Sequence, residues 1–282
     1  MATETVGRWI VPSPASIAAY VPLLAFAAVV VYPLLLMVGD SLKTQYEIFS
    51  QPNSFPAHLR FDNYVRAWQQ ANFGTYFVNS LIVTVASVAL ILLFGSMAAY
   101  VLGRSELPGR NALHVFFLLG LMLPIRLAIV PLFVMFRDLE LLDTLQGLVI
   151  VYVASGLPFA IFVLTSFVKS IPRELDEAAS IDGASDFTIY RRVILPLATP
   201  GLAVVGIYST VAVWNDYFFP LVFIRTPELR TLPLGVTTFF GEHATQWDLV
   251  FAGLSITALP LVLMFIVLNR QFVKSLTAGA FR

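Results

Sequence analysis

The sequence predicts an all-α, polytopic membrane protein that crosses the bilayer six times. Hydrophobic residues make up 58% of its 282 residues and charged residues only 12%, whereas soluble domains contain roughly 45 to 50% apolar and 25% charged residues. The mean hydropathy is correspondingly high, at +0.83. Six separate apolar windows are each long enough to cross the hydrocarbon layer.

Each window meets the length requirement for a membrane helix, about 20 largely apolar residues at 1.5 Å rise per residue. The first window could be a secretory signal, because Arg8 precedes it. Its apolar run is too long for a signal, and no small-x-small cleavage site follows before Asp40, so we expect a retained helix. The predicted spans are residues 17–38, 76–102, 113–136, 145–168, 202–224 and 249–268.

Proline recurs inside the predicted spans. In lipid, a proline is tolerated where neighbouring helices or cavity water satisfy the carbonyl that it leaves free. The pattern therefore predicts a packed bundle of bent helices, and ordinary kinks are favoured over moving hinges because proline is common in membrane helices. These prolines are Pro22, Pro33, Pro124, Pro131, Pro158, Pro220 and Pro260.

The distribution of Lys and Arg over the short loops predicts that both chain ends lie inside. With an inner N-terminus, ten basic residues fall on the inner side and six on the outer side. We therefore expect a cytoplasmic segment at 1–16, a six-helix transmembrane domain at 17–270 and a cytoplasmic tail at 271–282. A charged loop at 172–196 then lies at the inner surface.

Composition argues against several function classes. The formal net charge is zero, so nothing indicates nucleic-acid binding. Cysteine is absent, and His58, His114 and His243 lack paired-ligand or HExxH spacing, so no metal or catalytic site is expected. No G-x-x-x-x-G-K-[ST] occurs, so the chain cannot hold ATP in a P-loop and is not expected to be an enzyme.

The longest charged stretch, residues 177–200, reads EAASIDGASDFTIYRRVILPLATP. Acidic residues crowd the first turns of a short predicted helix, where the macrodipole favours anions, and Gly183 can take the left-handed conformation that ends it. A second helix can begin at Ser185. The alternative is an amphipathic segment resting on lipid headgroups, but anionic headgroups attract basic rather than acidic segments.

This helix, turn and helix resembles the EAA loop of ABC-importer permeases. The matching residues are Glu177-Ala178-Ala179, Asp182-Gly183-Ala184 and Leu195-Pro196, with Val193 where Ile is usual. The resemblance extends over residues 61–279 and is closest to the shorter six-helix subunit of maltose-type carbohydrate permeases. Further matching stretches are Phe61-Asp62-Asn63-Tyr64, Asn79-Ser80-Leu81, Leu157-Pro158-Phe159-Ala160 and Trp214-Asn215-Asp216.

The resemblance implies a type I ABC importer permease fold in the bacterial cytoplasmic membrane. It implies a heterodimer with a second permease subunit, two ABC ATPase subunits that hold ATP and Mg²⁺, and an extracytoplasmic solute-binding protein. The substrate would be a mono- or oligosaccharide. The loop would dock on the ATPase, with Glu177 in an ion pair and Gly183 at the turn. The coupling residues expected by resemblance are Glu177, Ala178, Ala179, Ile181, Asp182, Gly183 and Ala184.

Two ionisable residues fall inside predicted spans, where a charge indicates a polar pathway or a paired lock. In straight helices, Arg126 and Asp216 would each lie roughly 14 to 16 Å below the outer end, and they could pair. A purely structural pair, or access to vestibule water, is the alternative. Planar amides and aromatic faces suit sugars, so the candidate substrate pathway comprises Asn79, Arg126, Tyr152, Trp214, Asn215, Asp216 and Tyr217.

Two rival interpretations remain open. A secondary transporter driven by protons or sodium would be expected to have inverted repeats and midplane carboxylates, of which only Asp216 is present. Within the importer class, glycerol phosphate or another small polar solute is the alternative substrate.

Overall fold

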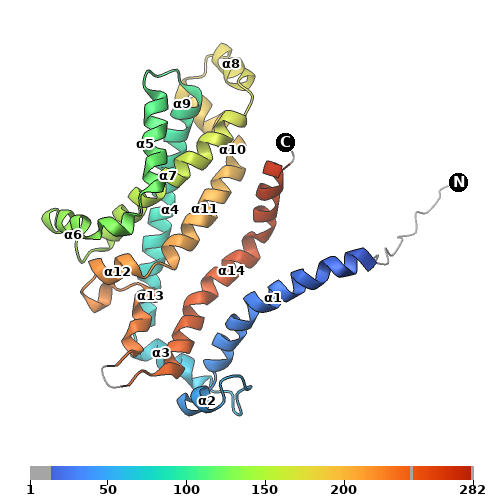
Figure 1. Cartoon of the computed structure of the whole chain (residues 1–282). Helices are drawn as coiled ribbons and strands as arrows, with labels where there is room; N and C mark the ends of the chain where they lie inside the picture. The colour runs from blue at the N-terminus through green and yellow to red at the C-terminus, as the bar shows by residue number, and fades with distance from the viewer. Residues whose placement is uncertain (1–13, 242–243, 281–282) are drawn as a thin grey trace.

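The computed structural model describes residues 14–241 and 244–280, which are predominantly helical (Figure 1). Four helices are long and apolar enough to cross a membrane, and counting each of two bent helix pairs as one span gives up to six. This confirms the predicted all-α, polytopic class. The long helices are α1 (Pro14–Asp40), α4 (Phe73–Arg104), α7 (Leu145–Ser170) and α14 (Trp247–Ala280). Arg8, His243 and Arg282 lie outside the described residues.

Helices α4 and α7 form the centre of the bundle, and small residues let them approach closely. A Cβ added at Gly95 would lie 2.8 Å from Ala160 Cβ, and one at Gly103 would lie 2.7 Å from Val168 Cγ1. Close approach through small residues is the usual way in which membrane helices associate. Helix α11 (Thr199–Trp214) packs against both, and α5 (Arg110–Met122) packs against α7.

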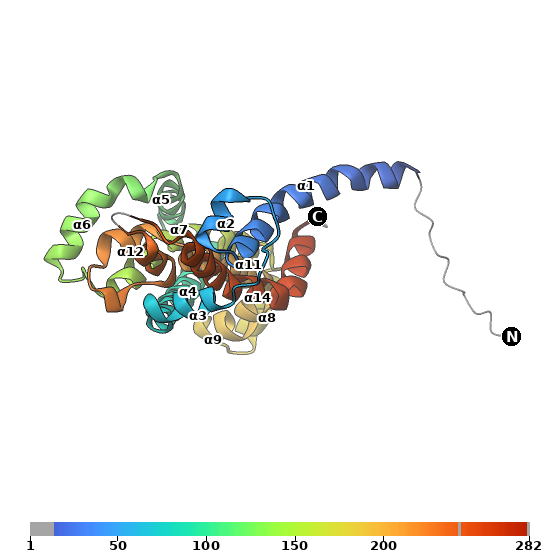
Figure 2. The same ribbon diagram turned by 90° about the horizontal axis from the view of Figure 1, so that it is seen from below.

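The third predicted span is not one helix. Helix α5 is followed by the short 3-10 helix η1 (Ile125–Ala128) and α6 (Ile129–Asp138), with a bend of 82°. Leu123 takes an extended conformation, because the ring of Pro124 disfavours the helical region for the preceding residue. In both ribbon views α6 points away from the bundle (Figure 2). The depth expected for Arg126 assumed a straight helix and is therefore wrong.

The fifth predicted span is also interrupted. Helix α11 ends at Trp214 and α12 (Phe218–Phe223) follows after three residues. The Asp216 Oδ2 accepts a hydrogen bond of 2.9 Å from the N–H of Phe219, so the carboxylate satisfies a free donor at the start of α12. The straight-helix depth expected for Asp216 is therefore wrong as well.

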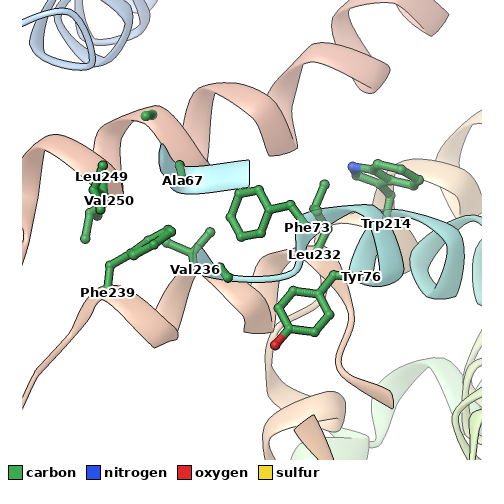
Figure 3. Close-up of a cluster of buried hydrophobic side chains, with 11 residues drawn as sticks. Ala67, Phe73, Tyr76, Trp214, Leu232, Val236, Phe239, Leu249 and Val250 are labelled. Atoms are coloured by element: carbon green, nitrogen blue, oxygen red, sulfur yellow. The ribbon is translucent and has the colours of Figure 1, made fainter. Parts of the chain in front are cut away.

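Short helices cover the end of the bundle near α2 (Gln45–Ser50) and α3 (Asp62–Gln70). From the C-terminal half come η3 (Pro227–Leu229), α13 (Leu232–Gly235) and η4 (Val236–Phe239). They enclose an apolar cluster in which Phe73, Leu232, Phe239 and Leu249 are buried (Figure 3). This cluster joins segments far apart in the chain and fixes that end as one body.

A buried ion pair ends α1 at this same end. The Nζ of Lys43, which is 1% exposed, lies 2.8 Å from the Asp40 Oδ1. The Asn63 amide donates to the carbonyls of Ser41 and Lys43 at 2.9 Å each. The two charges compensate each other, and the Asn63 amide attaches the turn that follows α1 to α3.

Asp143 links the loop before α7 to the loop after α12. Its Oδ1 accepts from the N–H groups of Arg225 at 2.8 Å and Thr226 at 2.9 Å, and its Oδ2 accepts from the Thr226 hydroxyl. These bonds, led by that of the Thr226 hydroxyl, lower the pKa of Asp143. Because its pKa is lowered, the ionised Asp143 carboxylate stabilises the fold at pH values above the ordinary pKa of Asp. This stabilisation is lost as the pH falls through the folded-state pKa.

We expect Asp143→Ala to destabilise this loop by about 2 kcal/mol at pH 7, because three hydrogen bonds to a charged acceptor are lost. Asp143 has a φ of +56°, which Ala disfavours and Asn tolerates, so Asp143→Asn is the matched control and should lose less. Thermal unfolding of the purified protein at pH 7 and near pH 3 measures both variants. A deficit that is equally large at acid pH would contradict the role of the carboxylate.

Candidate functional site

A two-helix elbow projects from the opposite end of the bundle (Figure 1). Helix α8 (Glu174–Ile181) is followed by Gly183 with a φ of +79°, and α9 (Asp186–Ile189) begins after Ser185, whose hydroxyl accepts from the Thr188 N–H. The predicted helix, glycine turn and second helix are confirmed. The start of the first helix is favoured by its three acidic residues in the first turn.

The second arm of the elbow leads back into the bundle through an unusual turn. Residues Tyr190–Ile194 form a π-helix, η2, followed by α10 (Leu195–Leu197) and a bend of 74° into α11. The Tyr190 hydroxyl lies 2.8 Å from Ser96 Oγ on α4, and the Tyr190 and Tyr100 rings are 5.4 Å apart. The elbow is therefore anchored in the bundle at its second arm. Pi-helical turns occur frequently at functional sites.

The outer face of the elbow carries apolar and acidic residues together. Ile181 is 86% exposed and Phe187 61% exposed, and Glu177 and Ala178 are also exposed. Ala179 in contrast packs against the chain's own buried cluster around Ile189 and Ile194, as does Ala184. Ala178 and Ile181 are therefore the more exposed apolar residues of α8, and the docking role expected for Ala179 stays a prediction. An exposed apolar patch with a polar rim is typical of a protein interface.

A second candidate site is a cavity of about 310 Å³ inside the bundle, between α7, α11 and η1. Its walls combine the aromatic rings of Tyr152, Phe159 and Tyr208 with the charged groups of Arg126 and Asp216. The Phe159 and Tyr208 rings are 4.2 Å apart between centroids. Mostly apolar walls with a few convergent polar groups are the usual features of a small-molecule site, and a volume of this order is at the lower end of such sites.

Asp216 organises the polar side of this cavity. Its side chain is 6% exposed, and its Oδ1 lies 3.0 Å from Arg126 Nη2, so the predicted Arg126–Asp216 pair is confirmed. Its Oδ2 accepts from the Tyr152 hydroxyl and from the Phe219 N–H, at 2.9 Å each. The Arg126 side chain is 64% exposed and also lies over the Phe218 ring, at 5.3 Å. Arg126 therefore presents free donors to the cavity while Asp216 holds it in place.

Comparison with known proteins places this architecture in one family. Residues 91–277 match the family described as "binding-protein-dependent transport system inner membrane component". The chain belongs to this family. It is thus a permease, a multi-pass subunit of the inner membrane, and the members it matches are transport subunits without enzymatic activity.

Similar permeases cover nearly the whole chain. The diacetylchitobiose uptake system permease protein NgcG of Streptomyces coelicolor is 40% identical over 92% of this chain and 87% of its own length. The melibiose/raffinose/stachyose import permease protein MelC of Bacillus subtilis is 34% identical, over 88% of this chain and 90% of its own. A crystal structure of a bacterial ABC transporter involved in the import of the acidic polysaccharide alginate contains a chain with a TM-score of 0.80 and 25% identity. The match covers 93% of this permease and 99% of that chain. The predicted importer permease fold is confirmed.

Three of the seven residues expected on the substrate pathway of this permease line the cavity: Arg126, Tyr152 and Asp216. Asn215 and Tyr217 line a different cavity of about 390 Å³, beside η4 and α14. Trp214 is buried, and its indole N–H donates to the Thr257 carbonyl at 3.0 Å. Asn215, Asp216 and Tyr217 lie in the break after α11, where Asp216 lines one cavity and its two neighbours line the other.

Asn79 occupies a structural position in the permease. Its Nδ2 donates to the carbonyls of Glu228 at 2.7 Å and Arg230 at 3.0 Å, and its neighbour Ser80 accepts from the Leu232 N–H at 2.7 Å. Both side chains hold the η3 loop against α4. The donors that would contact a sugar are therefore already used by the backbone.

Phe159 and Tyr208 line the cavity but were not among the residues predicted on the substrate pathway. They lie on α7 and α11, separated by about 50 positions in sequence, and each falls in a run of apolar residues. No local pattern distinguishes them from lipid-facing aromatics. Within residues 14–241 and 244–280, no group of three or more His, Asp or Glu side chains is placed to hold a metal ion.

Proposed function

We propose that this permease carries an uncharged oligosaccharide across the inner membrane, driven by partner ATPases. The observation that carries this proposal is the combination of an exposed elbow for docking with a cavity whose only charged wall residues, Arg126 and Asp216, neutralise each other. A cavity without net charge suits neutral hydroxyl-rich ligands better than an anion such as glycerol phosphate. The names of two similar permeases, of diacetylchitobiose and melibiose/raffinose/stachyose systems, support an oligosaccharide substrate, whereas the structural neighbour takes part in the import of an acidic polysaccharide, so the lack of charge is argued from the cavity alone.

The elbow would be the mechanical contact with the ATPase. In this mechanism, ATP binding closes the two ATPase subunits, the grooves that hold α8 approach one another, and the bundle changes from inward-facing to outward-facing. Ile181 and Ala178 supply apolar burial in the groove, while Glu177 fixes the register through an ion pair. Apolar burial is assigned most of the docking energy, because an exposed ion pair contributes only about 0.2 to 1 kcal/mol.

The orientation follows from this assignment. If α8 contacts a cytoplasmic ATPase, both chain ends are cytoplasmic, and 1–16, 172–196 and 271–282 are the cytoplasmic parts. The opposite end, with α2, α3 and the η3 loop, would then face the solute-binding protein. The excess of Lys and Arg near the elbow end agrees with this orientation.

In the transmembrane pathway, one sugar ring would stack on the aromatic pair formed by Phe159 and Tyr208. Sugar rings present apolar faces that pack on aromatic rings, and hydroxyl edges that take hydrogen bonds. Arg126, held by Asp216, would donate to the hydroxyl edge. Tyr152 would act through Asp216 rather than by direct contact, because its hydroxyl already donates to that carboxylate.

Uptake by the full complex in sealed vesicles tests this function. We expect uptake of a neutral oligosaccharide to require the binding protein, together with ATP on the side that carries the elbow. Vesicles without binding protein are the control. Uptake that follows an imposed proton or sodium gradient without ATP would refute the proposal in favour of a secondary transporter, and preferred uptake of glycerol phosphate would refute the substrate class.

A further inference from the structure

A desolvated ion pair joins the first arm of the elbow to the end of α4. Arg104 is the last residue of α4, and its side chain is 7% exposed. The Arg104 Nε lies 2.9 Å from the Asp176 Oδ2 on α8, and its Nη2 donates to the Ile171 carbonyl, just after α7, at 2.8 Å. The Arg104 guanidinium thus links the end of α4, to which Arg104 belongs, to the end of α7 and the start of α8.

The surroundings make this contact costly to open. Asp176 Oδ1 and Arg104 Nε are both buried and have no hydrogen-bond partner among the described residues, so the 2.9 Å contact between Arg104 Nε and Asp176 Oδ2 is an ion pair that compensates the two charges. Burial also raises the pKa of Asp176, against the opposing effect of Arg104. Separating α8 from α4 would leave the Arg104 guanidinium, which is 7% exposed, without its counter-charge, and this is unfavourable. The planar fork of Arg further fixes the relative direction of its two partners.

The elements on either side are themselves rigid. Gly103 lies against Val168 so closely that no Cβ fits, which locks the end of α4 to α7. The second arm of the elbow is held separately, through the Tyr190 hydroxyl and Ser96. The first arm, α8, lacks a buried large side chain, so the Arg104–Asp176 pair is its main polar attachment to the bundle.

We propose that Arg104 is a positioning residue that makes α8 and α4 move as one body, so that a displacement of the elbow reaches the transmembrane helices. This inference rests on the proposed function of the elbow. Without the pair, α8 could follow the ATPase while α4 stays behind. ATP hydrolysis would then continue with less sugar moved per ATP.

The test uses the complete complex in proteoliposomes, with binding protein and sugar, and measures both ATP hydrolysis and uptake. For Arg104→Gln and Asp176→Asn we expect the amount of sugar transported per ATP to fall about 2- to 30-fold, the range that coupling mutations usually span. The double variant should be no worse than the worse single variant. Glu106→Gln is the matched control, because Glu106 is 88% exposed and its contact with Arg173, at 4.0 Å, is long for an ion pair. It should keep the wild-type ratio.

A purely structural role predicts a different result: uptake and hydrolysis would fall together with the amount of assembled complex, at a constant ratio. That outcome overturns the inference. If Arg104→Gln does not assemble, Asp176→Asn gives the answer, since it preserves volume and removes only the charge. If the wild-type complex shows no ATP-driven uptake, the proposed function fails instead.

Distance measurements give an independent readout. The chain contains no cysteine, so spin labels can be placed by Glu174→Cys on α8 and Met97→Cys on α4 without removing other thiols from it. In the wild-type background the distance between the labels should be the same with and without trapped ATP. In the Arg104→Gln background it should change between the two states. An invariant distance in both backgrounds would contradict the inference.

Discussion

Gly183→Val is expected to lower ATP-driven uptake roughly 5- to 30-fold while the complex remains assembled in the membrane. Gly183 has a φ of +79°, and no atom lies within 4 Å of the position that a Cβ would occupy. The cost is therefore one of backbone conformation alone, about 1 to 2 kcal/mol for an L-residue and more for a β-branched one. One to two kcal/mol corresponds to a factor of about 5 to 30 in an equilibrium. The turn would open and move α8 out of its docking position.

Gly183→Asn is the matched control, because Asn tolerates the left-handed conformation. It should retain most of the uptake, although it adds a longer and more polar side chain than Val in the same open space. Uptake, ATP hydrolysis and the amount of assembled complex are compared for both variants. Equal activity of Gly183→Val and the wild type would remove the elbow from the mechanism, and equal loss in both variants would show that side-chain volume, not the turn, matters.

Charge at Glu177 tests the docking face without changing the turn. Its side chain is exposed on α8, so substitution should leave the fold intact. Glu177→Gln loses one exposed ion pair, which contributes only about 0.2 to 1 kcal/mol, and should reduce uptake modestly. Glu177→Lys places like charges together and should uncouple uptake far more. Similar uptake in these two variants would argue against a basic partner for Glu177.

The second large effect is expected at Asp216. Asp216→Ala would leave the Tyr152 hydroxyl and the Phe219 N–H without an acceptor in a buried site, in addition to freeing Arg126. Each unsatisfied buried donor costs about 1 to 3 kcal/mol, so we expect a loss of roughly 3 kcal/mol in stability together with loss of uptake. Thermal unfolding of the purified complex measures the first effect, and vesicle uptake the second.

Arg126→Gln separates the effect on uptake from the effect on stability. Stability should fall less than in Asp216→Ala, because Asp216 loses its counter-charge but keeps the donors Tyr152 and Phe219, whereas uptake should fall if Arg126 contacts the sugar. A charge swap of the two residues should not restore function, because position 216 receives two uncharged donors that an arginine cannot accept. Restoration by the swap would mean that the Tyr152 and Phe219 contacts are dispensable. Normal uptake by Arg126→Gln would show that the charge of Arg126 is not needed for sugar transport.

The sequence predicted the straight parts of the fold well because membrane crossing depends on length and hydropathy alone. Helices α1, α4, α7 and α14 lie where apolar windows predicted spans, and the elbow follows from local rules at Gly183 and Ser185. The breaks within the third and fifth predicted spans were not predicted. Pro124 was noted as a kink, yet nothing local fixes an angle of 82°, which depends on how α5 packs against α7.

The candidate site was predicted only where charge made it conspicuous. Arg126 and Asp216 stand out because ionisable residues are rare in membrane helices. Trp214 and Asn79 matched the chemistry of sugar binding, but their polar groups bond to the backbones of other segments, a pairing that depends on tertiary structure. Arg104 is one of the ten basic residues expected on the inner side, and its contact with Asp176 depends on the folded chain.

The first helix differs from the rest of the molecule in what keeps it in place. None of the 18-residue apolar window in α1 is buried, and the helix is attached to the rest of the chain through contacts with α14 and through the turn after Asp40, where the Ser41 hydroxyl lies 2.6 Å from the Tyr64 hydroxyl. Lipid rather than tertiary packing therefore determines which side chains are acceptable along most of its length. An unrelated apolar helix joined to the same Asp40–Lys43 terminus should serve equally well for the folding of this subunit, so membrane insertion and bundle stability are encoded in separate parts of the chain.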